Sequence, residues 1–134
     1  TPQDAQLLED VARELADTLP EEAVLALEGD LGAGKTTFVK GLALAWRIKE
    51  PVTSPTFNIY NLYSGDRQLA HMDAYRLERS PEIWDELMLE ELVQPPFCLA
   101  IEWPSKLAYI PWPITRRIEF SATGEERTLR LIED

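Results

Sequence analysis

Eight residues in the first third of the chain have the types and spacing that bind phosphate groups. They match the pattern G-x-x-x-x-G-K-[ST] at every defined position and read Gly29-Asp30-Leu31-Gly32-Ala33-Gly34-Lys35-Thr36. Glycines let the backbone curl so that several N–H groups point into one concavity, and the start of a following helix adds partial positive charge. The pattern therefore predicts a loop that cradles the phosphates of a nucleotide.

Two side chains at the end of this motif predict specific contacts. Lys35 would reach the β and γ phosphates, and the Thr36 hydroxyl would coordinate Mg²⁺. A second, acidic metal ligand is expected at the end of a neighbouring apolar strand, because Mg²⁺ prefers oxygen ligands. Glu102 and Asp73 both end such segments. Which of them would bind metal and which would orient water is left open, and for each the simpler alternative is a solvated carboxylate at a strand end.

Three further features could border such a site. The segment Thr53-Ser54-Pro55-Thr56 carries hydroxyls that could sense the γ-phosphate and Mg²⁺, although Thr and Ser are also ordinary turn residues. His71, the only histidine, is either a structural hydrogen-bonding residue or part of the site. Trp103 follows Glu102 directly and could stack on a base or simply pack.

The charge balance indicates what kind of partner the chain could have. It carries 13 Lys and Arg against 24 Asp and Glu, a net charge of −11. Proteins that bind nucleic acid tightly usually show a basic face, so we do not expect this chain to bind DNA or to hold any nucleic acid tightly by itself. The sequence has no Asn-Lys-x-Asp segment of the kind that reads guanine in GTPases, which favours ATP.

Length and composition predict one domain, spanning 1–134. No stretch approaches the roughly 18 apolar residues of a membrane span, and the first residues lack the features of a secretion signal. We therefore expect a cytoplasmic location without membrane association. The single cysteine, Cys98, lies in an apolar run and is expected to be a small buried core residue.

The spacing of apolar residues predicts the elements that must position these groups. Helical spacing predicts a first helix that is capped at Asp4 and ends before Pro20, a second over 37–46, and a third over 80–92 that is opened by a proline at its first position. Continuous apolar runs predict strands buried on both faces at 23–27 and 97–101. Alternation predicts two hairpins, one pairing 57–63 with 68–72 and one pairing 114–120 with 128–132. The expected fold is α/β: a single P-loop NTPase-like domain whose mixed sheet has a parallel core, antiparallel strands and helices on both faces.

Taken together, these motifs resemble the TsaE (YjeE) family, the bacterial ATPase needed to make threonylcarbamoyladenosine in tRNA. Four blocks carry the resemblance in the same order over nearly the whole chain: LEGDLGAGKTT at 27–37, SPTF at 54–57, HMDAYRL at 71–77 and IEWP at 101–104. The first block is common to many nucleotide-binding proteins. The third block followed by the fourth is much more particular.

The resemblance implies a compact P-loop domain with slow intrinsic ATPase activity, using ATP and Mg²⁺. It implies two protein partners, the threonylcarbamoyl transferase subunit and its dimerising companion (TsaD and TsaB type). These partners transfer the threonylcarbamoyl group to an adenosine beside the tRNA anticodon (t6A37), and contact with tRNA would fall mainly to them. The family member itself does not perform that transfer; its ATP cycle would drive or reset the complex.

The resemblance also assigns roles to residues of this chain. Lys35, Asp73 and Glu102 would be catalytic, and Thr36, Glu102 and Asp73 would serve the metal. The nucleotide would contact nine residues: Asp30, Leu31, Gly32, Ala33, Gly34, Lys35, Thr36, Thr37 and Trp103. One departure from the family pattern is Met88, which stands where relatives often have glycine and which makes the local helix boundary uncertain.

Two other classes of function use the same phosphate cradle. A small-molecule kinase would transfer phosphate to a metabolite without a protein partner, although 134 residues are few for a substrate domain. A nucleotide-gated binding module would hydrolyse negligibly and would use ATP only to order the 53–56 loop. Replacement of Glu102 separates this binding module from an ATPase.

Overall fold

The computed structural model describes residues 2–29, 34–55, 59–75, 77, 82–123 and 126–132, except for the side chains of 2–4, 122–123 and 126–127. The helices are α1 (Pro2–Ala16), α2 (Lys35–Ala45), α3 (Ile83–Leu87), α4 (Leu89–Leu92) and a 3-10 turn, η1 (Pro104–Lys106). The strands are β1 (Glu22–Gly29), β2 (Tyr60–Ser64), β3 (Gln68–Asp73), β4 (Phe97–Glu102), β5 (Arg116–Thr123) and β6 (Glu126–Ile132).

One six-stranded sheet, in the order β2-β3-β4-β1-β5-β6, forms the centre of the fold. Strands β3, β4, β1 and β5 are parallel to one another, and each edge of the sheet carries an antiparallel partner, β2 beside β3 on one side and β6 beside β5 on the other. The predicted mixed sheet with a parallel core is therefore confirmed. Every residue of β4 is buried, as its continuous apolar run predicts for a strand covered on both faces.

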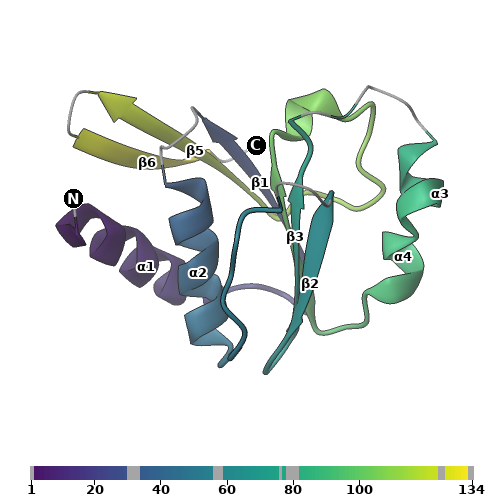
Figure 1. The fold of residues 1–134 in the computed structure, drawn as a ribbon, viewed down its shortest axis with the longest axis horizontal. Helices are drawn as coiled ribbons and strands as arrows, with labels where there is room; N and C mark the ends of the chain where they lie inside the picture. The colour runs from purple at the N-terminus through teal and green to yellow at the C-terminus, as the bar shows by residue number, and fades with distance from the viewer. Residues whose placement is uncertain are drawn as a thin grey trace.

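Helices cover the two faces of the sheet unequally (Figure 1). Helices α1 and α2 pack on one face, where Leu25, Leu27, Phe38, Leu42 and Phe120 belong to a single buried cluster. Helices α3 and α4 pack on the other face beside β3 and β4, where Trp84, Leu89, Leu99 and Ile101 form a second cluster. The expected α/β fold with helices on both faces is confirmed. Within the described part of the chain, no helix combines the length and apolarity that crossing a membrane requires.

Cys98 lies on β4 in the first cluster and is fully buried, as expected. Burial raises the pKa of its thiol to about 12, because the thiolate would lose its hydration in this apolar surrounding. The thiol is therefore protonated at neutral pH, and Cys98 is a packing residue rather than a nucleophile.

Arg67 ties three separate segments together at the amino-terminal edge of the parallel strands. Its Nη2 donates to the carbonyl of Pro20 at 2.6 Å, to that of Glu21 at 3.0 Å and to that of Phe97. Burial lowers the pKa of the guanidinium, yet charge-assisted bonds to the carbonyl groups compensate its desolvation. No local sequence pattern predicts this role, because the carbonyl groups that Arg67 contacts belong to residues 30 or more positions away.

The helix at the start of the chain begins and ends earlier than the sequence predicts. Helix α1 ends at Ala16 instead of continuing to Leu19, and Thr18 turns the chain by bonding back to Leu15. Leu8, Ala12 and Leu15 face the core, whereas Leu7 is 63% exposed. The first hairpin strand begins at Tyr60 in the structure, and residues 57 and 58 of its predicted start lie outside the described residues.

The single helix predicted over 80–92 is wrong for the described part of that range. The chain forms two short helices, α3 and α4, that meet at Met88. Met88 has φ 59° and ψ 20°, the left-handed conformation that ends a helix and that costs least for glycine. Leu87 and Leu89 are buried on either side, so the turn aims both apolar side chains at the second cluster.

Replacing Met88 by glycine should stabilise the protein. The left-handed conformation costs a residue with a Cβ roughly 1–2 kcal/mol, partly offset by the greater freedom of glycine in the unfolded chain. Met88 is 51% exposed, so little burial is lost. We expect Met88→Gly to raise the free energy of unfolding by about 0.5–1 kcal/mol in urea denaturation, and Met88→Ala to change it little. A glycine variant less stable than the alanine variant would contradict this account of the turn.

Candidate functional site

Polar side chains gather where the parallel strands end. Glu102 is the last residue of β4, and in the sheet register it lies opposite Asp73 of β3 and Leu27 of β1. Side chains alternate along each strand, and Leu27 belongs to the cluster beneath α1 and α2. Both carboxylates therefore project on the same face as α2, at the carboxyl edge of the sheet, where ligands of α/β proteins usually bind.

The glycine motif lies beside these carboxylates, between β1 and α2. Its first glycine ends β1 with φ 140°, and Gly34 has φ 106°, both in the region that residues with a Cβ rarely adopt. Helix α2 begins immediately afterwards at Lys35, and the amide of Phe38 bonds to the carbonyl of Gly34. The free N–H groups in the first turn of α2 therefore lie at this edge of the sheet, where they could donate hydrogen bonds to an anion.

A cavity of about 270 Å³ joins the motif to the carboxylates. It is lined by Gly34, Lys35, Thr36, Thr37, Ser54, Asp73 and Glu102. The structure thus brings together the end of the motif, both predicted carboxylates and one residue of the 53–56 loop. Their chemical roles stay predictions.

Lys35 is held at the rim of the site by two groups. Its side chain is buried, its Nζ donates to the carbonyl of Gly29 at 2.7 Å, and the ammonium lies 3.9 Å from the centre of the Trp103 ring. A carbonyl and an aromatic face both stabilise a buried cation. Trp103 itself has φ 58° and ψ 52°, and its ring also contacts Tyr75, with ring centres 5.0 Å apart. The predicted bordering tryptophan therefore contacts the motif lysine directly.

The sequence did not reveal which residue holds Glu102 in place. His71 Nε2 lies 2.5 Å from Oε2 of Glu102. His71 is completely buried, and Glu102 is 5% exposed. His71 lies two residues before Asp73 on the same strand, so both face α2. The alternation of side chains along a strand is the sequence signal that could have placed His71 on the same face as Asp73. The histidine was expected to be structural or functional, and the structure places it next to the site.

Part of the predicted set lies outside the described residues. Asp30, Leu31, Gly32 and Ala33 of the motif are among them, as are Thr56 and Arg76 from the other blocks. The nucleotide contacts expected of the motif residues in this group remain predictions.

The residues of the cavity fit a magnesium ion bound together with a nucleotide. Thr36 offers a hydroxyl oxygen, and Asp73 and Glu102 offer carboxylate oxygens from one wall. Mg²⁺ usually takes one or two carboxylates and completes its octahedron with phosphate and water oxygens. Among the residues that the structure describes, no group of three His, Cys, Asp or Glu could hold a metal by itself.

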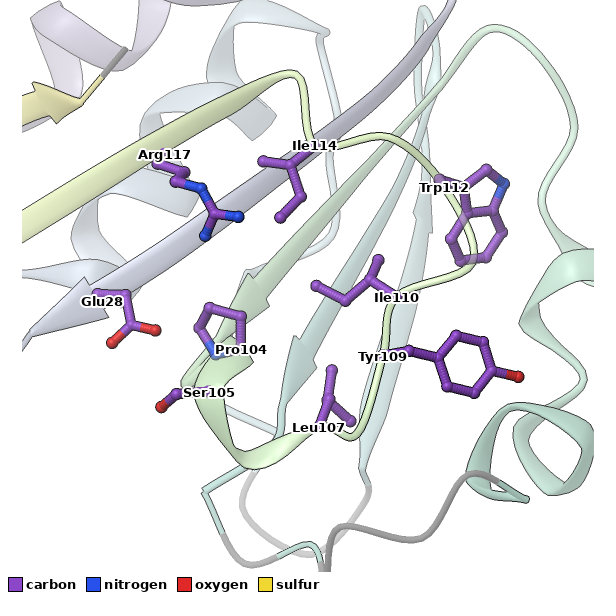
Figure 2. Close-up of a pocket in the computed structure, with 9 residues that line it drawn as sticks. All are labelled: Glu28, Pro104, Ser105, Leu107, Tyr109, Ile110, Trp112, Ile114 and Arg117. Atoms are coloured by element: carbon purple, nitrogen blue, oxygen red, sulfur yellow. The ribbon is translucent and has the colours of Figure 1, made fainter. Parts of the chain in front are cut away.

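A second cavity, of about 440 Å³, lies on the opposite face of the sheet (Figure 2). Its wall contains Leu107, Ile110 and Trp112, and Glu28 and Arg117 line its other side. It shares no lining residue with the site described above. Its lining mixes polar and apolar side chains and contains neither a glycine of the motif nor a lysine.

The fold defines an α/β protein with a six-stranded mixed sheet, in which the glycine motif of the sequence runs from the end of the buried central strand β1 to the start of α2. The chain belongs to the TsaE family: the family model described as "Threonylcarbamoyl adenosine biosynthesis protein TsaE" matches residues 2–132. The resemblance predicted from the sequence blocks is thereby confirmed.

Individual relatives agree with this family. The chain is 45% identical over 101 residues to the tRNA threonylcarbamoyladenosine biosynthesis protein TsaE of a Nostoc species, covering 72% of this chain and 62% of that protein. It is 38% identical over 117 residues to the protein of the same name from Borreliella burgdorferi, covering 84% and 83% of the two chains. The crystal structure of Bacillus subtilis YdiB superposes with a TM-score of 0.69 at 33% identity, covering 93% of this chain and 77% of that one.

Gly29 should tolerate no larger residue. A Cβ at this position would lie 2.1 Å from the carbonyl oxygen of Phe120, the residue that pairs with it on β5. With a φ of 140° added to this clash, we expect Gly29→Ala to lower the free energy of unfolding by more than about 2 kcal/mol. Glu22→Ala, an exposed change on the same strand, should shift it by less than about 0.5 kcal/mol. Equal urea midpoints for the two variants would show that the backbone here is not constrained.

Proposed function

We propose that this chain is a Mg²⁺-dependent ATPase that acts in the biosynthesis of threonylcarbamoyladenosine in tRNA. The observation that carries the proposal is the single cavity in which the end of the glycine motif meets Asp73 and Glu102. Membership of the TsaE family and the names of the relatives supply the pathway. The tRNA-modifying transfer itself would belong to partner proteins, since this site holds only phosphate-handling groups.

Each residue of the cavity would have a defined task. The backbone of the motif and the start of α2 would bind the phosphates, and Lys35 would exchange its contact with the Gly29 carbonyl for the β and γ phosphates. Mg²⁺, held by Thr36 and a carboxylate, would neutralise charge that develops on the phosphate oxygens. The remaining carboxylate oxygens of Asp73 and Glu102 would orient the attacking water in line with the bond that breaks.

The position of Glu102 favours hydrolysis over simple binding. Glu102 is 5% exposed, so its carboxylate has lost much of its hydration. A buried charge of this kind is stable only where polar or charged groups contact it. Its low-dielectric surrounding also strengthens its electrostatic interaction with water or metal. A module that only bound ATP would gain little from a buried carboxylate placed beside the partly buried Asp73.

Hydrolysis of Mg-ATP by the purified chain tests the proposal. We expect a slow turnover that disappears in Lys35→Ala and falls at least about 100-fold in Glu102→Gln, while Glu102→Gln still binds ATP. Glu119→Gln makes the same chemical change at an exposed carboxylate on β5 and should leave turnover unchanged. Wild-type turnover in Glu102→Gln would remove the proposed site from consideration.

The proposed partners are tested by adding them to the same assay. The threonylcarbamoyl transferase subunit and its dimerising companion should raise the turnover several-fold, and the pair mixed with Lys35→Ala should show only background. The acidic chain, with net charge −11, would meet basic surfaces of these partners, so high salt should reduce the stimulation. A turnover that the pair does not change would argue against the proposed role and for a kinase, to be sought by a metabolite screen.

A further inference from the structure

His71 contacts the carboxylate of Glu102 but does not line the cavity that contains Glu102. The imidazole of His71 has no exposed surface, and its Nε2 lies 2.5 Å from Oε2 of Glu102. The two residues are 31 positions apart and come from the neighbouring strands β3 and β4. Among the described residues, Nδ1 of His71 has no hydrogen-bond partner, so the contact with Glu102 is the one that its ring makes.

The carboxylate needs such an anchor for an electrostatic reason. Glu102 and Asp73 are register partners on adjacent strands, and like charges directly opposite one another repel. A glutamate has several rotatable bonds, so without a fixed contact its carboxylate would turn away from Asp73. A donor at Oε2 holds one oxygen in place and leaves Oε1 for the cavity that Glu102 lines.

We propose that His71 is a positioning residue whose Nε2–H fixes the carboxylate of Glu102 for its work in the site. The inference rests on the proposed ATPase function, because the work in question is orienting water or binding Mg²⁺. His71 lines no part of the cavity, so it acts only through Glu102. The alternative is a histidine that only fills space in the core.

Two substitutions at His71 separate these roles. His71→Gln keeps an N–H donor at similar reach, whereas His71→Met fills the space without a donor. We expect kcat for Mg-ATP hydrolysis to fall about 10-fold or more in His71→Met and to be largely restored in His71→Gln, with KM for ATP changed less than about 2-fold. A space-filling histidine would give the opposite order or no change in kcat.

A matched control removes the effect of lost stability. Met72→Ala empties a fully buried position on the same strand but on the opposite face, among the residues beneath α3 and α4. It should lower the thermal midpoint of unfolding without changing kcat of the folded protein. A loss of kcat in Met72→Ala equal to that in His71→Met would overturn the proposal.

A double-mutant cycle tests whether His71 acts through Glu102. In a Glu102→Gln background, His71→Met should reduce the remaining turnover by less than about 2-fold, because the group that it positions is already gone. An undiminished 10-fold loss in that background would show that His71 acts by another route.

A readout without hydrolysis separates failure of this inference from failure of the proposed function. The chain has one histidine, so a long-range proton–nitrogen NMR spectrum reports on His71 alone. We expect the proton on Nε2 and a marked shift of that nitrogen in Glu102→Gln. If the wild-type chain proves unable to hydrolyse ATP, the Mg²⁺ concentration that half-saturates ATP binding decides: it should rise about 10-fold in His71→Met, and an unchanged value would overturn the inference.

Discussion

The register between β1, β4 and β3 is the constraint on which the site depends. It places Glu102 opposite both Leu27 and Asp73, so that a carboxylate at the end of one strand meets a carboxylate from the next beside the glycine motif. Side chains on a strand alternate between faces, and a shift of one residue would turn Glu102 toward α3 and α4. The buried apolar positions prevent that shift, because Leu99 and Ile101 would then leave the second cluster for the first.

Strained and buried groups occur together where these strands end. Gly29 and Trp103 both have positive φ, at the ends of the neighbouring strands β1 and β4. The amide of Trp103 bonds to the carbonyl of Leu27, so the turn at Trp103 stays attached to the sheet while its ring lies over the ammonium of Lys35. Residues with unusual backbone conformations, such as a non-glycine residue with positive φ, occur frequently in binding and catalytic sites.

The sequence predicted those parts of the fold that follow from local patterns. Two apolar runs became the central strands, the glycine motif fell between a strand and a helix, and Asp73 and Glu102 lie at strand ends as expected. These predictions succeed because consecutive residues carry both patterns: a continuous apolar run indicates a strand buried on both faces, and the glycine motif indicates a turn between a strand and a helix. The family resemblance added the pathway, which no local pattern contains.

The remaining features depend on contacts between distant segments. The bond between His71 and Glu102 and the three carbonyl contacts of Arg67 need a known register and a known sheet order. Local propensity does not predict the break at Met88, because methionine is a good helix former; only the family resemblance, in which relatives often have glycine there, made this helix boundary uncertain. Here the burial of Leu87 and Leu89 overrides local propensity.

A crystal structure with a non-hydrolysable ATP analogue and Mg²⁺ tests the central claim most directly. The account predicts phosphates against the start of α2, Lys35 Nζ moved from the Gly29 carbonyl to the phosphates, and a metal ion contacting Thr36 and at least one of Asp73 and Glu102. An analogue bound elsewhere, for example in the cavity beside Glu28 and Arg117, with Lys35 still on the Gly29 carbonyl, would contradict it.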